Sequence, residues 1–279
     1  MEVFSAIEGL RRFLQPPRQA GQRIALVPTM GFLHEGHLSL VRAAKAENDI
    51  VITSIFVNPT QFGPAEDYSR YPRDEARDTS LLEAEGVHAV LLPSVATMYP
   101  QGNSTAVLPP TQSEGWCGEK RPGHFQGVCS VVAMLFNIVQ PDRAYFGEKD
   151  AQQLAVIRQM TQDLHFPIEI IGCPIVRDPD GLALSSRNVY LSAAERADAL
   201  VLSQALYQGL ALFQAGERSA ARILDAGRAQ IEAKSTIRLD YLGIVDQNTF
   251  KAIATVREGA IFLGAIHAGK TRLIDNMRF

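Results

Sequence analysis

Two histidines three residues apart, His34 and His37, lie where an apolar run gives way to a turn. The run at residues 24–27 is typical of a buried strand, and Pro28 and Gly31 end it before an amphipathic stretch typical of a helix. In a helical segment this spacing places both imidazoles on one face, where both could donate to the same phosphate. We interpret the junction as an anion-binding turn with free backbone N–H groups at the carboxyl end of a parallel strand.

Two other interpretations of these histidines are possible. A zinc site would need further Cys, His or Asp ligands at suitable spacing, and none lies nearby. The histidines could instead be polar neighbours of a core built by Met30, Phe32 and Leu33. The combination of a strand, turn glycines and paired imidazoles favours phosphate binding. The pattern His-x-Gly-His resembles the signature of the nucleotidylyl transferase superfamily, in which the imidazoles donate hydrogen bonds to the phosphates of ATP.

A second pattern of strand, glycine and charge occurs where Phe146 and Gly147 precede Glu148, Lys149 and Asp150. Acidic residues at a helix start can simply complement the helix dipole, and a lysine there can be a solvated surface residue. A lysine placed just after a glycine at the carboxyl end of a strand is better explained by a phosphate contact, because its ammonium group acts as a point charge.

A third phosphate-binding group is predicted at Ser185, Ser186 and Arg187, which offer two hydroxyl donors and a guanidinium fork beside a loop that contains Gly181. The alternative is a simple helix-entry turn. Function is favoured because Arg187 lies outside any amphipathic face that needs a charge.

Two glutamines, Gln61 and Gln153, complete the candidate residues. Each amide offers a donor and an acceptor together, which suits a substrate that carries both a carboxylate and a hydroxyl group. As isolated residues they would carry no functional meaning, so their assignment depends on the other motifs.

Composition excludes several classes of function. The chain has 279 residues, with 27 Lys plus Arg against 30 Asp plus Glu and a net charge of -3, so no basic field favours nucleic acid. No stretch approaches the roughly 20 apolar residues that a membrane span requires. The cysteines, Cys117, Cys129 and Cys173, contain no Cys-x-x-Cys pair and suit a reducing compartment. We therefore expect a cytoplasmic globular protein with no nucleic-acid or membrane partner.

Apolar runs alternate with amphipathic stretches through the first part of the chain. Strands are predicted at 23–27, 49–57, 89–92, 144–146 and 168–171, and helices at 38–46, 74–85, 128–139 and 150–164. A first helix, patterned from Phe4 to Leu14, is expected to stop at Pro16-Pro17. A long loop covers residues 93–122. This alternation predicts an α/β fold, a Rossmann-like doubly wound parallel sheet, over residues 1–176.

The remainder, residues 177–279, has a different pattern. Ser192 and Glu195 form a capping box for a helix that runs to Gln214. A second helix is predicted at 220–234, with strands at 239–245 and 260–267. We therefore expect a second, smaller α+β C-terminal domain.

Six motifs in order along the chain resemble the pantothenate synthetase family, the pantoate beta-alanine ligases of the nucleotidylyl transferase superfamily. They are Pro28-Thr-Met-Gly-Phe-Leu-His-Glu-Gly-His37, Phe56-Val-Asn-Pro-Thr-Gln-Phe62, Tyr71-Pro-Arg73, Arg121-Pro-Gly-His-Phe125, Phe146-Gly-Glu-Lys-Asp150 and Leu184-Ser-Ser-Arg-Asn188. The resemblance spans nearly the whole chain and implies a ligase of pantothenate biosynthesis. In such an enzyme pantoate attacks the α-phosphate of ATP to give pantoyl adenylate and pyrophosphate, and beta-alanine then displaces AMP.

The resemblance also implies roles for individual residues. The expected ATP-binding residues are Met30, Gly31, Phe32, Leu33, His34, Glu35, Gly36, His37, Gly147, Glu148, Lys149, Asp150, Val176, Leu184, Ser185, Ser186 and Arg187. The catalytic residues among them are His37, as proton donor or phosphate stabiliser, with His34, Lys149 and Arg187. Gln61 and Gln153 are expected to hold pantoate, with Gln61 also close to beta-alanine. Apolar Met30, Leu40, Val131 and Phe146 could pack against the gem-dimethyl group of pantoate, or be plain core.

Magnesium is expected to accompany the ATP and neutralise its charge, with Asp78 as a possible ligand. The resemblance further implies a homodimer. The C-terminal domain is expected to act as a lid that closes over ATP, since Arg187 lies just past the domain boundary whereas His37 and Lys149 precede it.

Two other functions stay open at this point. A nucleotidylyl transferase that leaves AMP or CMP on a phosphorylated acceptor would share the histidine turn, and release of free AMP with an amine acceptor separates the two. A nucleotide-binding sensor could keep the site without turnover, although intact His37, Lys149 and Arg187 argue against it.

Overall fold

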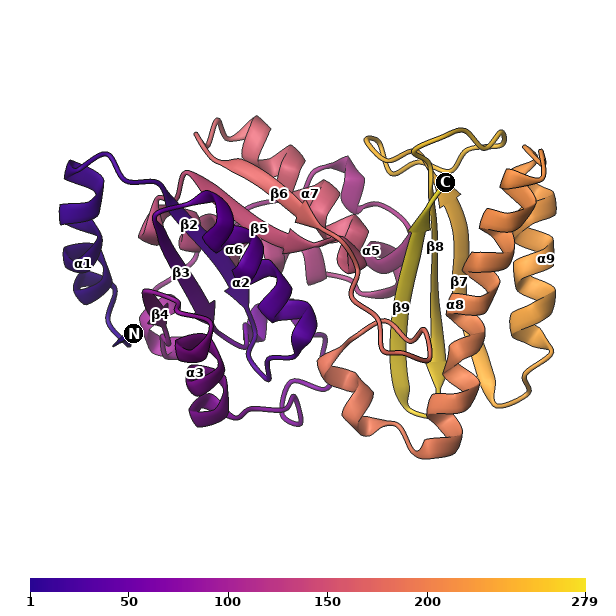
Figure 1. Ribbon diagram of the computed structural model, residues 1–279, viewed down its shortest axis with the longest axis horizontal. Helices are drawn as coiled ribbons and strands as arrows, with labels where there is room; N and C mark the ends of the chain where they lie inside the picture. Colours follow the sequence, from indigo (N-terminus) through magenta and orange to yellow (C-terminus); the bar gives the residue numbers. More distant parts are fainter. The chain divides into compact units, whose positions relative to one another are not determined.

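The computed structural model describes residues 1–279, which divide into two compact units (Figure 1). The first unit comprises Met1–Glu148 and Val156–Pro174, and the second comprises Lys149–Ala155 and Ile175–Phe279. The second unit thus includes a short segment, 149–155, that the sequence analysis assigned to the first domain. No helix has the length and apolar composition that crossing a membrane would need.

A six-stranded parallel sheet forms the centre of the first unit. Its strands are β1 (Glu2–Phe4), β2 (Ile24–Thr29), β3 (Ile50–Ile55), β4 (Ala89–Leu91), β5 (Arg143–Gly147) and β6 (Glu169–Cys173), in the order β1-β4-β3-β2-β5-β6. All six residues of β3 are buried, as expected for a β-branched run covered on both faces. The predicted doubly wound sheet is confirmed.

The strand order reverses at β2 and β5, which are neighbours in the sheet through Ala25 and Arg143. From β2 the chain moves outward to β3 and β4, and it returns to β5 and β6 on the other side. Open α/β sheets bind ligands outside the carboxyl ends of their strands at such a switch point. The two predicted motifs that follow β2 and β5 therefore share one end of the sheet.

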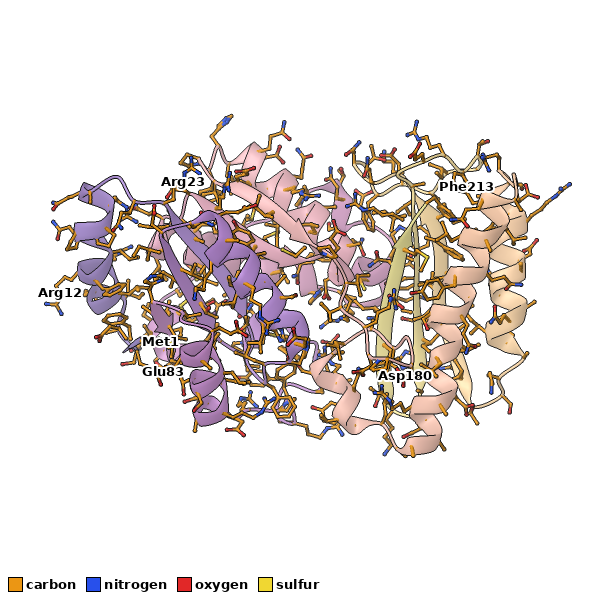
Figure 2. All side chains as sticks on the ribbon, viewed as in Figure 1. Met1, Arg12, Arg23, Glu83, Asp180 and Phe213 are labelled. Carbon is orange, nitrogen blue, oxygen red and sulfur yellow. The ribbon has the colours of Figure 1, made fainter.

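Strand β1 was not predicted, because a three-residue strand is too short to show a period. Phe4, which the sequence analysis included in the first helix, ends this strand. The strand pairs with β4, and the amide of Glu2 donates to the carbonyl of His88 at 3.0 Å. The Met1 amino group lies 3.6 Å from the Glu83 carboxylate; both residues are labelled in Figure 2.

Helices flank the sheet of the first unit (Figure 1). They are α1 (Ile7–Gln19), α2 (Glu35–Glu47), α3 (Glu75–Ala84), α4 (Val95–Met98), α5 (Trp116–Lys120), α6 (His124–Val139) and α7 (Ala151–Asp163), with 3₁₀ turns η1 (Pro59–Gln61), η2 (Thr111–Ser113) and η3 (Glu148–Asp150). Helix α7 belongs to both units, since 151–155 lie in the second. The expected loop at 93–122 contains α4, η2 and α5.

The prediction that the first helix stops at Pro16-Pro17 was wrong, since α1 continues to Gln19. Proline lacks the N–H donor, yet its carbonyl still accepts. The amides of Ala20 and Gln22 donate to the carbonyls of Pro16 and Pro17, each at 3.0 Å, and complete the last turn.

The second unit contains a three-stranded antiparallel sheet, β7 (Ile237–Val245), β8 (Ile261–Ala268) and β9 (Thr271–Arg278) in that order. Helices α8 (Ala193–Gln214) and α9 (Ala220–Glu232) pack beside it, and a 3₁₀ helix, η4 (Ser186–Tyr190), precedes them (Figure 1). The predicted capping box of Ser192 and Glu195 is confirmed. Strand β9 was not predicted, because the buried polar pair Asp275 and Asn276 interrupts its apolar pattern.

Candidate active site

The turn after β2 has a strained backbone that local contacts hold in place. Gly31 and Phe32 both have positive φ, +82° and +51°. The Thr29 hydroxyl donates to the Ser54 carbonyl at 2.8 Å and accepts the Gly31 amide at 3.2 Å. A Cβ atom on Gly31 would lie 2.9 Å from Ile55 Cγ2. Glycine is therefore required at position 31 both by the backbone angle and by the close packing.

Asp78 of α3 holds the next two residues of this turn. Its Oδ2 accepts the amide of Phe32 at 2.6 Å and its Oδ1 accepts the amide of Leu33 at 2.7 Å. The side chain is only 1% exposed, and this burial raises the pKa of Asp78 although the two amides act in the opposite direction. Asp78 is the anchor of the turn.

This geometry does not fit Asp78 as the expected magnesium ligand. Both carboxylate oxygens already accept backbone amides, and the side chain is buried. No group of three or more His, Cys, Asp or Glu side chains in the structure is arranged to hold a metal ion. Magnesium in a nucleotide site is usually held by one or two carboxylates together with substrate phosphates and waters, so the magnesium expected with ATP stays a prediction without an assigned ligand.

The two histidines cap α2 with their own side chains. His34 Nδ1 accepts the amide of Gly36 at 3.2 Å, and His37 Nδ1 accepts the amide of His34 at 3.3 Å. The ring centroids lie 4.1 Å apart. Because Nδ1 is an acceptor in both neutral rings, this network assigns the proton to Nε2 in both. The reciprocal cap thus makes each Nε2–H a donor at the start of the helix.

Most of the amides of this turn that were expected to be free have partners within the chain. The amides of Gly31, Phe32, Leu33, His34 and Gly36 all donate to side chains of the chain itself. The helix also begins earlier than predicted, at Glu35, because the histidine cap starts it there. An anion at this turn would therefore meet imidazole donors and the positive end of the helix dipole, with fewer free amides than expected.

Gln61 is buried beside the histidine turn, at 8% exposure. Its Oε1 accepts from Asn58 Nδ2 at 3.1 Å, and its Nε2 lies 3.2 Å from the sulfur of Met30. Asn58 is 1% exposed, and its Oδ1 accepts from the Tyr99 hydroxyl at 2.8 Å. Asn58 thereby fixes which end of the Gln61 amide is the donor. Asn58 lies in the motif Phe56–Phe62, but no pattern in the sequence indicates this supporting role.

A chain of hydrogen-bonded side chains leads from Glu66 to the backbone carbonyl of Gln61. Arg121 pairs with both oxygens of Glu66, at 2.7 and 2.6 Å, and its Nη1 lies 2.9 Å from His124 Nε2. Arginine only donates, so His124 Nε2 accepts, and Nδ1–H donates to the Gln61 carbonyl at 2.9 Å. Burial acts to raise the pKa of Glu66, yet the paired guanidinium of Arg121 holds this pKa below its usual value.

Gly127 lets α6 approach η1 closely. A Cβ atom there would lie 2.4 Å from the Thr60 carbonyl oxygen and 2.6 Å from the Gln61 nitrogen. We expect Gly127→Ala to displace η1 and to lower the free energy of unfolding by about 1–3 kcal/mol, measured by urea denaturation. Asn137→Ala, at an exposed position of the same helix, should change it far less. Equal unfolding midpoints for the two variants would contradict this account of Gly127.

The third group of residues predicted to bind phosphate, Ser185–Arg187, lies in the second unit. Val176 and Leu184 close a hairpin in which the Leu184 amide donates to the Val176 carbonyl at 3.0 Å. Ser185 then caps η4 by accepting the amide of Arg187 at 3.2 Å. The segment is thus a helix-entry turn that also brings Val176 together with residues 184–187, and its binding of phosphate stays a prediction.

The remaining candidates divide between the units. Gly147 and Glu148 belong to the first, whereas Lys149, Asp150 and Gln153 belong to the second. This differs from the expectation that Lys149 belongs with the histidines. Leu40, Val131 and Phe146 are each at most 6% exposed and form part of the core of the first unit. Their contact with a substrate stays a prediction.

Comparisons with known proteins cover nearly the whole chain. The family model for pantoate-beta-alanine ligase matches residues 2–278. A pantothenate synthetase from Thermotoga neapolitana is 53% identical over 276 residues, covering 99% of each chain. One from Moorella thermoacetica is 53% identical over 277 residues, covering 99% of this chain and 98% of the relative.

Solved structures agree with this result. The pantothenate synthetase of Thermus thermophilus is 48% identical, with a TM-score of 0.95 over 99% of both chains. A pantoate-beta-alanine ligase from Francisella tularensis, solved with beta-gamma ATP and beta-alanine, is 33% identical with a TM-score of 0.81, covering 100% of this chain and 97% of that one. With the paired histidines at the switch point of the sheet, these matches place the chain in the pantoate-beta-alanine ligase family of enzymes, to which it belongs over nearly its whole length.

Proposed function

We propose that this ligase condenses pantoate with beta-alanine to pantothenate through a pantoyl adenylate, releasing AMP and pyrophosphate. The observation that carries the proposal is the pair of imidazoles whose reciprocal cap makes both Nε2–H groups donors at the carboxyl end of β2. The Francisella relative, crystallised with beta-gamma ATP and beta-alanine, supports the choice of nucleotide and amine.

In the first proposed step, a carboxylate oxygen of pantoate attacks the α-phosphorus of ATP. The bond from that phosphorus to the pyrophosphate oxygen breaks, so negative charge moves onto phosphoryl oxygens. The Nε2–H groups of His34 and His37 stabilise this charge, which is the usual function of preorganised donors in a phosphoryl transition state. Lys149 and Arg187 are the further residues proposed to contribute positive charge toward the nucleotide phosphates.

In the second proposed step, the amine of beta-alanine attacks the acyl carbon of the adenylate. A carbon–nitrogen bond forms, the carbon–oxygen bond breaks so that AMP leaves with that oxygen, and the amine releases its proton to solvent. Gln61 suits the carboxylate of pantoate because Asn58 occupies its Oε1 and leaves Nε2 as the donor end of the amide. Gln153, half-buried on α7, is the second proposed pantoate contact.

Three other expectations from the sequence stay predictions. These are the homodimer, the cytoplasmic location and the lid role of the C-terminal domain. Each can be measured without assuming the reaction.

An omission assay tests the proposed function directly. We expect pantothenate and free AMP only when ATP, pantoate and beta-alanine are all present. A transferase that keeps AMP on its acceptor would release pyrophosphate without free AMP, and a nucleotide sensor would bind ATP with no turnover. Either result would overturn the proposal.

A further inference from the structure

Two consecutive residues of β9 hold two different segments of the second unit. Asp275 binds the guanidinium of Arg177 with both oxygens, at 2.6 and 2.9 Å. The carboxylate is 4% exposed and the Arg177 side chain 15%. Arg177 also donates to the Gly181 carbonyl at 3.1 Å, so the ion pair fixes the hairpin that leads into Ser185–Arg187.

Asn276 holds the other segment. Its Nδ2 donates to the backbone carbonyl of Lys149 at 2.9 Å, across 127 positions of sequence. Its own amide donates to Asp275 Oδ1 at 2.8 Å, and its carbonyl accepts from Arg177 Nη2 at 3.3 Å. The residue is 6% exposed. Lys149 and the hairpin are therefore tied to adjacent residues of one strand.

The free-energy cost of burying the Arg177–Asp275 ion pair points to a role beyond attaching the hairpin. Burying an ion pair removes water from both charges, and their attraction offsets this cost only when the geometry is good. Well-packed apolar residues often stabilise a protein equally well. A fully bonded polar cluster does fix the relative position of the groups that it joins. Both segments joined here carry side chains that the proposed function assigns to ATP.

We propose that Asp275 and Asn276 are positioning residues that hold Lys149 and the segment Ser185–Arg187 in one array for binding ATP. This inference rests on the proposed function. Lys149 has a long, flexible side chain, so a fixed backbone sets the volume that its ammonium group can reach. Donors and charges held in place before the ligand arrives bind it without the cost of ordering them.

Titration calorimetry with ATP alone tests the inference, since it requires no turnover. We expect Asn276→Ala to raise the ATP dissociation constant about tenfold, the effect of one structurally important hydrogen bond. Asp275→Asn should act in the same direction because an amide cannot accept both guanidinium bonds. Asp240→Asn is the matched control, since it breaks the 2.9 Å ion pair with Arg272 in the same sheet, where Asp240 is 10% exposed.

A double-mutant cycle separates positioning from general stability. If Asn276 acts through Lys149, then Asn276→Ala should weaken ATP binding much less in a Lys149→Ala background. Asn276→Ala carries the test even if Asp275→Asn does not fold. An ATP affinity like that of Asp240→Asn, or an equal loss in both backgrounds, would overturn the inference. Failure of the proposed function would instead appear as an unmodified chain that forms no pantothenate.

Discussion

Replacing His37 by alanine should lower turnover by about two to three orders of magnitude in a protein that still folds. The variant loses the Nε2–H donor that the proposed mechanism directs at the phosphoryl group. It also loses the Nδ1 acceptor that receives the amide of His34 at 3.3 Å. That second loss is a helix cap, and it should cost only about 0.5–2 kcal/mol of stability. Steady-state kinetics together with thermal unfolding would measure both effects.

Two further variants separate the cap from the chemistry. His37→Asn keeps an acceptor near the position of Nδ1 but has no group at Nε2, so it should retain most of the stability and little of the turnover. His37→Gln offers a donor near the position of Nε2 and a poorer cap, so it should retain more turnover and less stability. If the asparagine variant turned over at nearly the unmodified rate, the role proposed for the Nε2–H group would be rejected.

Asp78→Ala should destabilise the protein by about 3 kcal/mol or more, since hydrogen bonds to a charged group contribute roughly 1.5–3 kcal/mol each and two are lost. The buried amide of Leu33 and the part-buried amide of Phe32 would both lose Asp78 as their acceptor. Phe32 would also lose a contact that holds its positive φ of 51°. Turnover should fall as well, because this backbone leads directly into the histidine cap. Urea denaturation and steady-state kinetics provide the measurements.

Asp74→Ala is the matched control on the same helix. Asp74 caps α3 by accepting the amide of Arg77 at 3.0 Å, and it does not bond to the histidine turn. Its loss should cost stability on the scale of a helix cap, about 0.5–2 kcal/mol, while turnover is kept. A normal turnover rate in folded Asp78→Ala would show that the turn keeps its shape without this anchor.

Local patterns were sufficient to predict most elements of the fold. Hydrophobic periodicity and the Ser192 capping box located the long helices and the buried parallel strands, because these signals lie within one segment. Two strands were missed for physical reasons. β1 has three residues, and β9 carries Asp275 and Asn276, whose burial depends on partners far away in sequence.

The sequence by itself determined which groups are proposed to carry the chemistry, because the histidine, lysine, serine and arginine motifs each lie in one short segment beside a strand end or a turn. Tertiary structure alone decided how those groups are held. Asp78 is 45 positions from the amide of Leu33, and Asn276 is 127 positions from Lys149. Hydrogen bonds between residues so far apart produce no periodic pattern in the sequence of either segment. The structure therefore shows a carboxylate expected to bind magnesium as an anchor of the backbone, and it shows that most of the amides expected to meet an anion have partners within the chain.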